Sequence, residues 1–165
     1  MAVPPTTTAS PLFLRGPEIR RGLELLYFGY SHLLRAIDET LEDQGLGRAH
    51  HRALYFIARQ PDLSVSELLA LLAITKQSLG RVLNELTARG LVEQRPGIND
   101  RRQRLLRLTP EGSALEQQLF NLLRERLSAA YGQAGQSAVA GFWQVLEGLI
   151  PLRERDRVAR LQRGG

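Results

Sequence analysis

Two short helices with separate caps, followed at once by a strand–turn–strand, constrain the fold of this chain more than any other feature. Ser64–Glu67 fits a capping box, in which a serine opens a helix and a glutamate three residues later binds back to its start. Thr75 caps a second helix that runs to Ala88 or Arg89, and Gly90 follows as its C′ glycine. Short helices joined by so tight a turn are typical of a helix-turn-helix.

A β-hairpin is predicted directly after this pair of helices. Residues 91–95 read as one strand and residues 104–108 as the returning strand, with Leu106 and Leu108 on one face. The segment 96–100 between them is Pro-Gly-Ile-Asn-Asp, which is dense in turn-forming residues. We therefore expect a mainly α protein with a small β-hairpin wing.

A long helical pattern precedes this unit. From Glu18 onward, apolar residues recur at alternating spacings of four and three, which gives a heptad-like seam. The seam consists of Leu23, Tyr27, Tyr30, Leu34, Ile37 and Leu41. Residues 45–47, Gly-Leu-Gly, break the pattern, and a second helix is expected from Arg48 to Arg59, before Pro61.

A second long helical pattern follows the hairpin. Thr109-Pro110 supplies a cap and then a proline at the first helical position. We expect Gly132 and Gly135 to interrupt this helix and a further helical segment to carry the apolar residues of 142–150. Pro151 then breaks or kinks the chain before an arginine-rich tail.

Positive charge is concentrated in one part of the chain. Residues 75–107 hold eight basic and three acidic side chains, a surplus of +5, and the net charge of all 165 residues is also +5. The remaining residues are therefore neutral overall. Concentrated positive charge on a helix and a hairpin is typical of a nucleic-acid binder.

The order of these elements resembles the MarR family of winged-helix transcriptional regulators. The resemblance covers roughly residues 19–150 and rests on residues 75–91 and two motifs, Asp100-Arg101-Arg102 and Arg107-Leu108-Thr109-Pro110-Glu111-Gly112. It implies a sequence-specific DNA-binding regulator, more often a repressor than an activator. Such a repressor occupies a pseudo-palindromic promoter site, blocks polymerase, and can be released by a small-molecule effector.

The resemblance also divides the chain. Residues 47–109 would form the winged helix-turn-helix DNA-binding domain, and residues 18–46 and 110–165 a helical dimerisation region, because the apolar seams of those segments exceed what a small winged helix needs for its own core. The family's helical ends interlock into a homodimer, so that two copies read a pseudo-palindrome. Residues 1–17, rich in proline and threonine, are expected to form a flexible arm.

Five polar residues of the helix from Thr75 lie off its apolar stripe and are candidates for the major groove. They are Lys76, Gln77, Ser78, Arg81 and Asn84. Paired hydrogen bonds would let Gln77 read adenine and Arg81 read guanine. The other three can equally hold phosphates, and the alternative for the whole set is the solvated polar face of an ordinary amphipathic helix.

Five residues of the hairpin are candidates for DNA contact through the wing. They are Arg95, Asp100, Arg101, Arg102 and Arg104. By resemblance, Arg102 enters the minor groove, where a guanidinium adds affinity and shape preference more than base identity. Asp100 would brace the turn or orient an arginine, and the other arginines would lie near phosphates. The alternative is a solvated charged hairpin.

Many family members bind small, often aromatic, effectors between the dimerisation helices and the winged helix. The candidates for such a pocket are Tyr27, Tyr30, His50, His51 and Arg52. Neighbouring histidines on a helix point about 100° apart, so His50 and His51 cannot both face one site. The alternative is a core or interface histidine beside an exposed one.

Several classes of protein are excluded or disfavoured. The chain has no cysteine, which excludes disulfides and thiolate metal sites, and it shows neither a secretory signal nor an apolar run long enough to span a membrane. We expect a cytoplasmic protein without cofactor or metal. No nucleophile–base pair, metal spacing or phosphate-binding loop indicates an enzyme. The competing reading is a winged-helix protein-interaction module without intrinsic DNA affinity.

Overall fold

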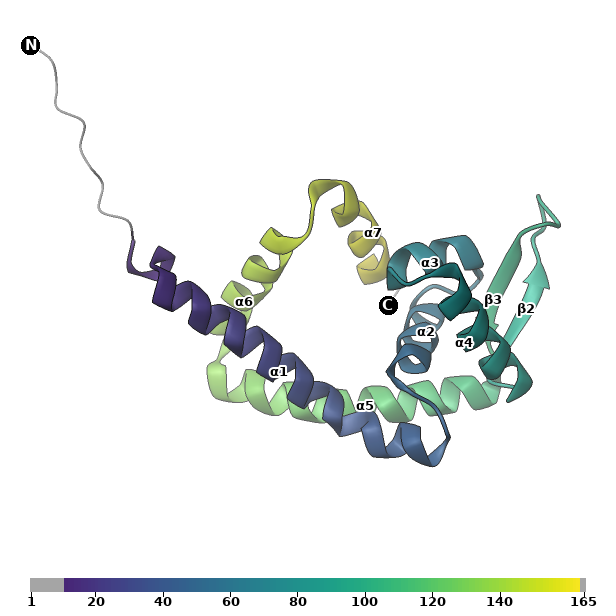
Figure 1. The fold of residues 1–165 in the computed structure, drawn as a ribbon, viewed down its shortest axis with the longest axis horizontal. Coiled ribbons are helices and arrows are strands. Elements are labelled where there is room, and N and C mark those ends of the chain that lie inside the picture. Colours follow the sequence, from purple (N-terminus) through teal and green to yellow (C-terminus); the bar gives the residue numbers. More distant parts are fainter. Residues whose placement is uncertain (1–10, 164–165) are drawn as a thin grey trace, which may run out of the picture.

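The structure is a computed structural model that describes residues 11–163, so residues 1–10 of the predicted arm lie outside the described part. The helices are α1 (Gly16–Asp43), α2 (Arg48–Arg59), α3 (Val65–Leu72), α4 (Lys76–Ala88), α5 (Pro110–Ala134), α6 (Gln136–Leu149) and α7 (Leu152–Arg163). The strands are β1 (Leu63–Ser64), β2 (Val92–Pro96) and β3 (Arg104–Leu108), and Leu12–Leu14 forms one 3₁₀ turn. The predicted class, mainly α with a small β-hairpin, is confirmed (Figure 1).

The core lies among α2, α3, α4 and the sheet, and it extends to the end of α1 and the start of α5. Most of its members are leucines from these elements, and the largest of them are fully buried. They include Ile37, Leu41, Leu54, Ile57, Leu63, Leu68, Leu79, Leu86, Val92, Leu106 and Leu119. Burial of each such side chain contributes about 1.5–3 kcal/mol, so this part of the molecule has a continuous core of its own.

The sheet has three antiparallel strands in the order β1-β3-β2. The hairpin pairs Val92 with Leu108 and Pro96 with Arg104, as expected from the turn between them. β1 adds two residues on the other side of β3, pairing Leu63 with Leu106. β1 was not predicted, because a strand of two residues shows no alternation of apolar and polar side chains.

The predicted helix caps are present. The Ser64 hydroxyl accepts a hydrogen bond from the Glu67 backbone N–H at 3.2 Å, and the Glu67 carboxylate accepts one from the Ser64 backbone N–H at 2.8 Å. Thr109 Oγ1 accepts from the Gly112 N–H at 3.0 Å and donates to the Gly90 carbonyl at 2.6 Å. These bonds satisfy backbone groups that a helix end leaves free.

The start of α5 lies so close to the end of α4 that only glycine fits at position 112. A Cβ added there would lie 1.9 Å from the Leu91 carbonyl oxygen, which already accepts the Thr109 N–H at 3.1 Å. Any larger residue would therefore push α5 away from the connection between α4 and β2. This is the physical reason for the glycine that ends the Leu108–Gly112 motif.

Outside this core, α1 runs beside α5, and α6 packs against α5 at the far end from the sheet (Figure 1). The large apolar side chains here are mostly exposed; we call them the outer apolar face. The face comprises Leu23, Leu25, Leu26, Tyr27, Phe28, Tyr30, Phe120, Phe142, Trp143, Val145 and Leu149. None of the described helices is both long and apolar enough to cross a membrane.

Several boundaries differ from those predicted, among them the strand predicted for residues 91–95, which is β2 at Val92–Pro96. α1 begins at Gly16, two residues before Glu18, because a proline fits the first turn of a helix. α5 continues through Gly132 and ends only at Gly135, whose φ of +83° favours glycine. The arginine-rich tail, for which no separate element was predicted, forms α7, which folds back to α2 and α3. Arg59 donates to the Leu161 carbonyl at 2.6 Å and Arg157 to the Ala70 carbonyl at 3.3 Å.

Candidate nucleic-acid interface

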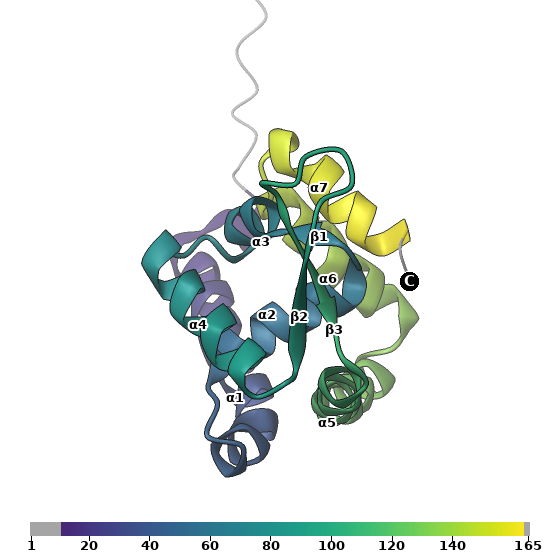
Figure 2. The same ribbon diagram turned by 90° about the vertical axis from the view of Figure 1, so that its right-hand side faces the viewer.

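α4 and the hairpin β2–β3 are exposed on the same side of the molecule, which faces the viewer in Figure 2. Four apolar residues of α4 are buried against the core, namely Leu79, Val82, Leu83 and Leu86. The five polar residues predicted to contact DNA are all exposed, as their position off that stripe requires. The structure therefore places Lys76, Gln77, Ser78, Arg81 and Asn84 together on one solvent-facing surface.

The first turn of α4 is suited to an anion. Thr75 Oγ1 accepts a hydrogen bond from the Ser78 N–H at 3.1 Å and donates its own hydrogen to Ser78 Oγ at 2.9 Å. The Ser78 hydroxyl hydrogen therefore stays free for an outside acceptor. With Lys76 beside it and the positive end of the helix beneath it, this turn matches a phosphate better than a base edge.

Gly80 has no role in packing within the described chain. A Cβ added there would meet no heavy atom within 4 Å. Glycine inside a helix costs about 0.5–1 kcal/mol relative to alanine, and no internal contact offsets that cost. A surface without a side chain at this position instead suits the close approach of another molecule between Gln77 and Arg81.

The wing ends in a turn that its own side chains hold in shape. Asp100 Oδ1 accepts a hydrogen bond from the Arg102 N–H at 2.9 Å, so this aspartate braces the turn, the first of its two predicted roles. The Gly97 N–H donates to the Gln103 carbonyl at 3.0 Å, and a Cβ at Gly97 would lie 2.5 Å from the Asp100 carbonyl oxygen. Arg102 therefore projects from a pre-organised loop.

The basic side chains of residues 75–107 fall into two groups. Arg89, Arg95 and Arg107 are held by other parts of the chain: Arg95 by Glu93, Arg107 by Asp62, and Arg89 by two backbone carbonyls. The second group makes no ion pair or side-chain hydrogen bond within residues 11–163; it comprises Lys76, Arg81, Arg101, Arg102 and Arg104. The charge available to a polyanion is therefore concentrated on α4 and the tip of the wing.

Comparison with known proteins decides between the readings of this surface. The sequence profile of the MarR family matches residues 44–103. PetP, an HTH-type transcriptional regulator of Rhodobacter capsulatus, is 48% identical over 139 residues, which cover 84% of this chain and 84% of PetP. The chain belongs to the MarR family.

Two solved structures of DNA-binding proteins match the same fold. A mutant of MarR from E. coli, complexed with operator DNA, superposes with a TM-score of 0.66 at 26% identity, over 86% of this chain and 100% of that chain. BpsR of Bordetella bronchiseptica, whose DNA binding is described as regulated by 6-hydroxynicotinic acid, gives a TM-score of 0.63 at 22% identity, over 78% of this chain and 98% of that chain.

Membership of the MarR family confirms two of the expectations. The protein is a DNA-binding transcriptional regulator, and it is not an enzyme. The competing reading, an interaction module without DNA affinity, has no support from these relatives. Among residues 11–163 no three His, Asp or Glu side chains cluster in a way that would hold a metal.

Two of the five residues predicted to form an effector pocket line a cavity in this MarR family member. Tyr27 and Tyr30 line a cavity of about 640 Å³ between α1, α5 and α6, with Phe142 and Leu146 on the opposite wall. The predicted histidines and Arg52 are not among the residues that line it. The shared effector pocket therefore stays a prediction, which this cavity supports for Tyr27 and Tyr30.

The two histidines have different environments. His50 is half-buried and hydrogen-bonded, with Nε2 at 2.7 Å from Glu85 Oε2. His51 is buried in the core, and neither of its ring nitrogens has a hydrogen-bond partner among the described residues. Burial, with a smaller contribution from Arg52, lowers the pKa of His51 below the ordinary 6.5. The alternative of a core histidine is correct for His51, whereas its neighbour is not freely exposed.

Sequence reasoning also missed three side chains that hold this surface in place. Glu85 and Arg89 on α4 bind partners that lie 35 to 45 residues away in the sequence, and Asp62 pairs with Arg107 across a similar separation. No local spacing marks such pairs. Asp62 has a positive φ of +65°, which is uncommon for a residue other than glycine, but the sequence gives no sign of it.

Proposed function

We propose that this MarR family regulator is a homodimeric repressor that occupies a pseudo-palindromic promoter site and blocks polymerase. The single observation that carries the proposal is the surface shared by α4 and the wing. It presents five basic side chains that have no ion-pair partner within residues 11–163, together with the uncharged side chains of Gln77 and Asn84. A helix that fits the major groove and a braced loop beside it match the docking geometry of winged helix-turn-helix proteins.

The side chains of this surface have different roles in the proposal. Gln77 and Arg81, on the exposed side of α4, read adenine and guanine by paired hydrogen bonds. Lys76, Ser78 and Asn84 hold phosphates, as the free hydroxyl of Ser78 at the helix start favours. Arg102 enters the adjacent minor groove from the wing. Three further arginines of the wing contact phosphates in this proposal: Arg95, Arg101 and Arg104. The ion pair between Arg95 and Glu93 must break before Arg95 can do so.

The outer apolar face supports the dimer. Tyr27 is 74% exposed, Tyr30 59% and Trp143 53%, on helices that otherwise pack side by side. Exposed apolar patches of this kind mark interaction surfaces on soluble proteins. A second copy seated on residues 18–46 and 110–165 would bury them and would set the separation of the two α4 helices at about one turn of DNA.

A small aromatic effector would act from the same region. The cavity lined by Tyr27, Tyr30 and Phe142 is mostly apolar and is within the usual size range of ligand sites. BpsR, which shares this fold, is a precedent for control of DNA binding by an aromatic acid. A ligand that binds here more tightly in one dimer geometry than in the other would shift the protein toward that geometry.

The test separates base reading from charge. Arg102→Ala should weaken binding to specific and nonspecific duplex alike and lower the slope of log affinity against log salt by about 0.9. Gln77→Ala should leave that slope unchanged and flatten sequence preference, by about 1–3 kcal/mol per lost base contact, and Arg81→Ala should flatten it similarly. Equal losses for all three variants on every duplex would contradict the assignment of base readers.

A further inference from the structure

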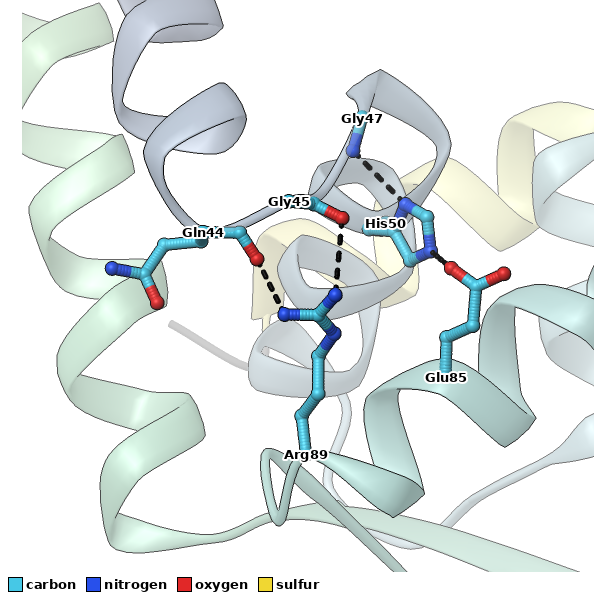
Figure 3. Close-up of polar contacts among 6 residues, drawn as sticks. All are labelled: Gln44, Gly45, Gly47, His50, Glu85 and Arg89. Carbon is cyan, nitrogen blue, oxygen red and sulfur yellow. Dashed lines mark hydrogen bonds and ion pairs between the residues drawn. The ribbon is translucent and has the colours of Figure 1, made fainter.

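Glu85, near the end of α4, and Arg89, the C-cap residue of that helix, bind the joint between α1 and α2. Glu85 and Arg89 are four residues apart and therefore lie on one face of the helix. Glu85 is bonded to His50 of α2, and Arg89 reaches the loop that leads out of α1, as Figure 3 shows. Gln77 and Arg81 lie on the same i, i+4 row, nearer the start of the helix, so the row contributes to the exposed surface at one end and binds this joint at the other.

The His50 ring bridges two helices, and its hydrogen bonds define its tautomer. The Gly47 backbone N–H donates to His50 Nδ1 at 3.0 Å, so Nδ1 carries the lone pair and no hydrogen. Nε2 must then carry the hydrogen and donate it to Glu85 Oε2 at 2.7 Å. One neutral ring thus caps the start of α2 and holds α4 against it.

Arg89 holds the other half of the joint. Its guanidinium donates to the Gln44 carbonyl at 2.5 Å and to the Gly45 carbonyl at 3.3 Å (Figure 3). Gln44 is the C-cap of α1, where carbonyls lack helical partners and the helix end is negative. Gly45 has a φ of +59°, and a Cβ there would lie only 3.1 Å from the guanidinium.

The same joint is fixed to α1 from the other side. Arg48, at the start of α2, donates two hydrogen bonds to the Asp38 carboxylate of α1 at 2.8 and 2.7 Å. α1 carries half of the outer apolar face, and its far end continues into that face without a break. A chain of direct contacts therefore runs from the helix expected to dimerise to the helix expected to read DNA.

We infer that Glu85, His50 and Arg89 are positioning residues for operator recognition. They touch no base, but they fix the angle of α4 relative to α1, and so the separation of the two α4 helices in a dimer. This inference rests on the proposed function, since the separation matters only if two copies bind one site. The residues act on the difference between specific and nonspecific DNA rather than on total affinity for DNA.

A pair of variants at one position isolates the hydrogen bond from the charge. Glu85→Ala and Glu85→Gln both remove one negative charge, but the glutamine oxygen can still accept the His50 Nε2 hydrogen. Measured on full-length protein, with a selected operator and a random duplex at matched salt, Glu85→Ala should lower the ratio of specific to nonspecific affinity about fivefold or more. Glu85→Gln should stay near the wild-type ratio. Thr87→Ala, an exposed change on the same helix, is the control.

Arg89→Lys tests the other contact. Lysine keeps the charge but presents one ammonium where the guanidinium serves two carbonyls. Positioning predicts a lower specific-to-nonspecific ratio with an unchanged salt slope. If Arg89 were a phosphate contact, the ratio would stay constant, and that result would overturn its assignment.

The outcomes for Glu85 are equally distinct. If Glu85→Ala raises affinity for all duplexes equally, as loss of a negative charge alone would, the inference fails. If the ratio falls equally in the alanine and glutamine variants, the hydrogen bond is not the cause and the inference also fails. If the wild-type protein binds no duplex in a salt-dependent way, the proposed function itself has failed, which is a separate result.

Discussion

The two ends of this molecule treat their apolar side chains in opposite ways. Around α2, α3, α4 and the sheet, residues such as Leu54, Leu86 and Leu106 are fully buried. On α1 and α6, side chains of similar size stay in solvent, with Tyr27 74% and Trp143 53% exposed. The winged-helix part therefore completes its core within one chain, whereas the outer helices complete theirs only against another surface.

This difference shows which end of the molecule gains folding stability from the burial of apolar side chains within one chain. Burial of apolar area contributes roughly 25 cal/mol per Å², so side chains left in water contribute almost nothing to the fold of the isolated chain. In the proposed dimer, the outer helices would carry the contact between the two copies, and the inner part the contact with DNA. The contacts among Gln44, His50, Glu85 and Arg89 are where the two meet.

The largest effect is expected when the stability cost of substituting a core residue is compared with that of substituting an outer one. Leu54→Ala should lower the free energy of unfolding by about 2–5 kcal/mol, because it leaves a cavity in a fully buried site. Tyr27→Ala should cost less than about 1 kcal/mol in dilute protein and more as the protein concentration rises. Urea titrations at several concentrations check this, and equal costs at every concentration would contradict the division into two ends.

A charge introduced into the outer apolar face tests whether this face joins two copies of the chain. Tyr30→Glu should weaken self-association on the order of a hundredfold, because an unpaired carboxylate would be buried between the copies. Sedimentation across a concentration series measures it. Ile98→Glu is the matched control, since Ile98 is an exposed apolar residue on the wing at 94% and should leave the dimer unchanged.

His51 gives the smallest and most local test. Burial lowers the pKa of His51 below 6.5. Between the lowered pKa and 6.5, the imidazole is therefore protonated in the unfolded chain and neutral in the folded chain. The resulting stability is present above pH 6.5 and is lost as the pH falls through the lowered folded value. His51→Leu should remove this pH dependence and, by eliminating an unpartnered buried N–H, raise stability by roughly 1 kcal/mol near neutral pH. Thermal unfolding at several pH values checks both, and an unchanged pH profile would contradict the account.

Features that depend on residues close together in the sequence could be predicted from the sequence. The caps at Ser64, Thr75 and Thr109 and the C′ role of Gly90 depend on residues within a few positions of each other. The hairpin turn does too, although it lies at 97–103 and was predicted at 96–100. The polar face of α4 followed from its apolar stripe, which needs only a helical period. These features fix the winged helix and the candidates for DNA contact.

What could not be predicted depends on residues far apart in the chain. From the sequence, Arg107 is one more arginine of the wing. In the structure it donates a hydrogen bond to Asp62, which lies 45 residues earlier in the chain. His50 read as a pocket residue, yet its partner is Glu85. The course of α7 back to Arg59 likewise depends on how α6 packs, and no pattern within residues 152–163 contains that information.

The measurement that tests the central claim most directly is selection of bound sequences from a random duplex library at a stated salt concentration. The account predicts enrichment of a pseudo-palindrome whose half-sites are centred about one helical turn apart, since two α4 surfaces are joined by the outer apolar face. It also predicts that Tyr30→Glu loses the symmetric site while the residual binding keeps one half-site. Enrichment of a single asymmetric site by the wild-type protein, or of no sequence at all, would contradict it.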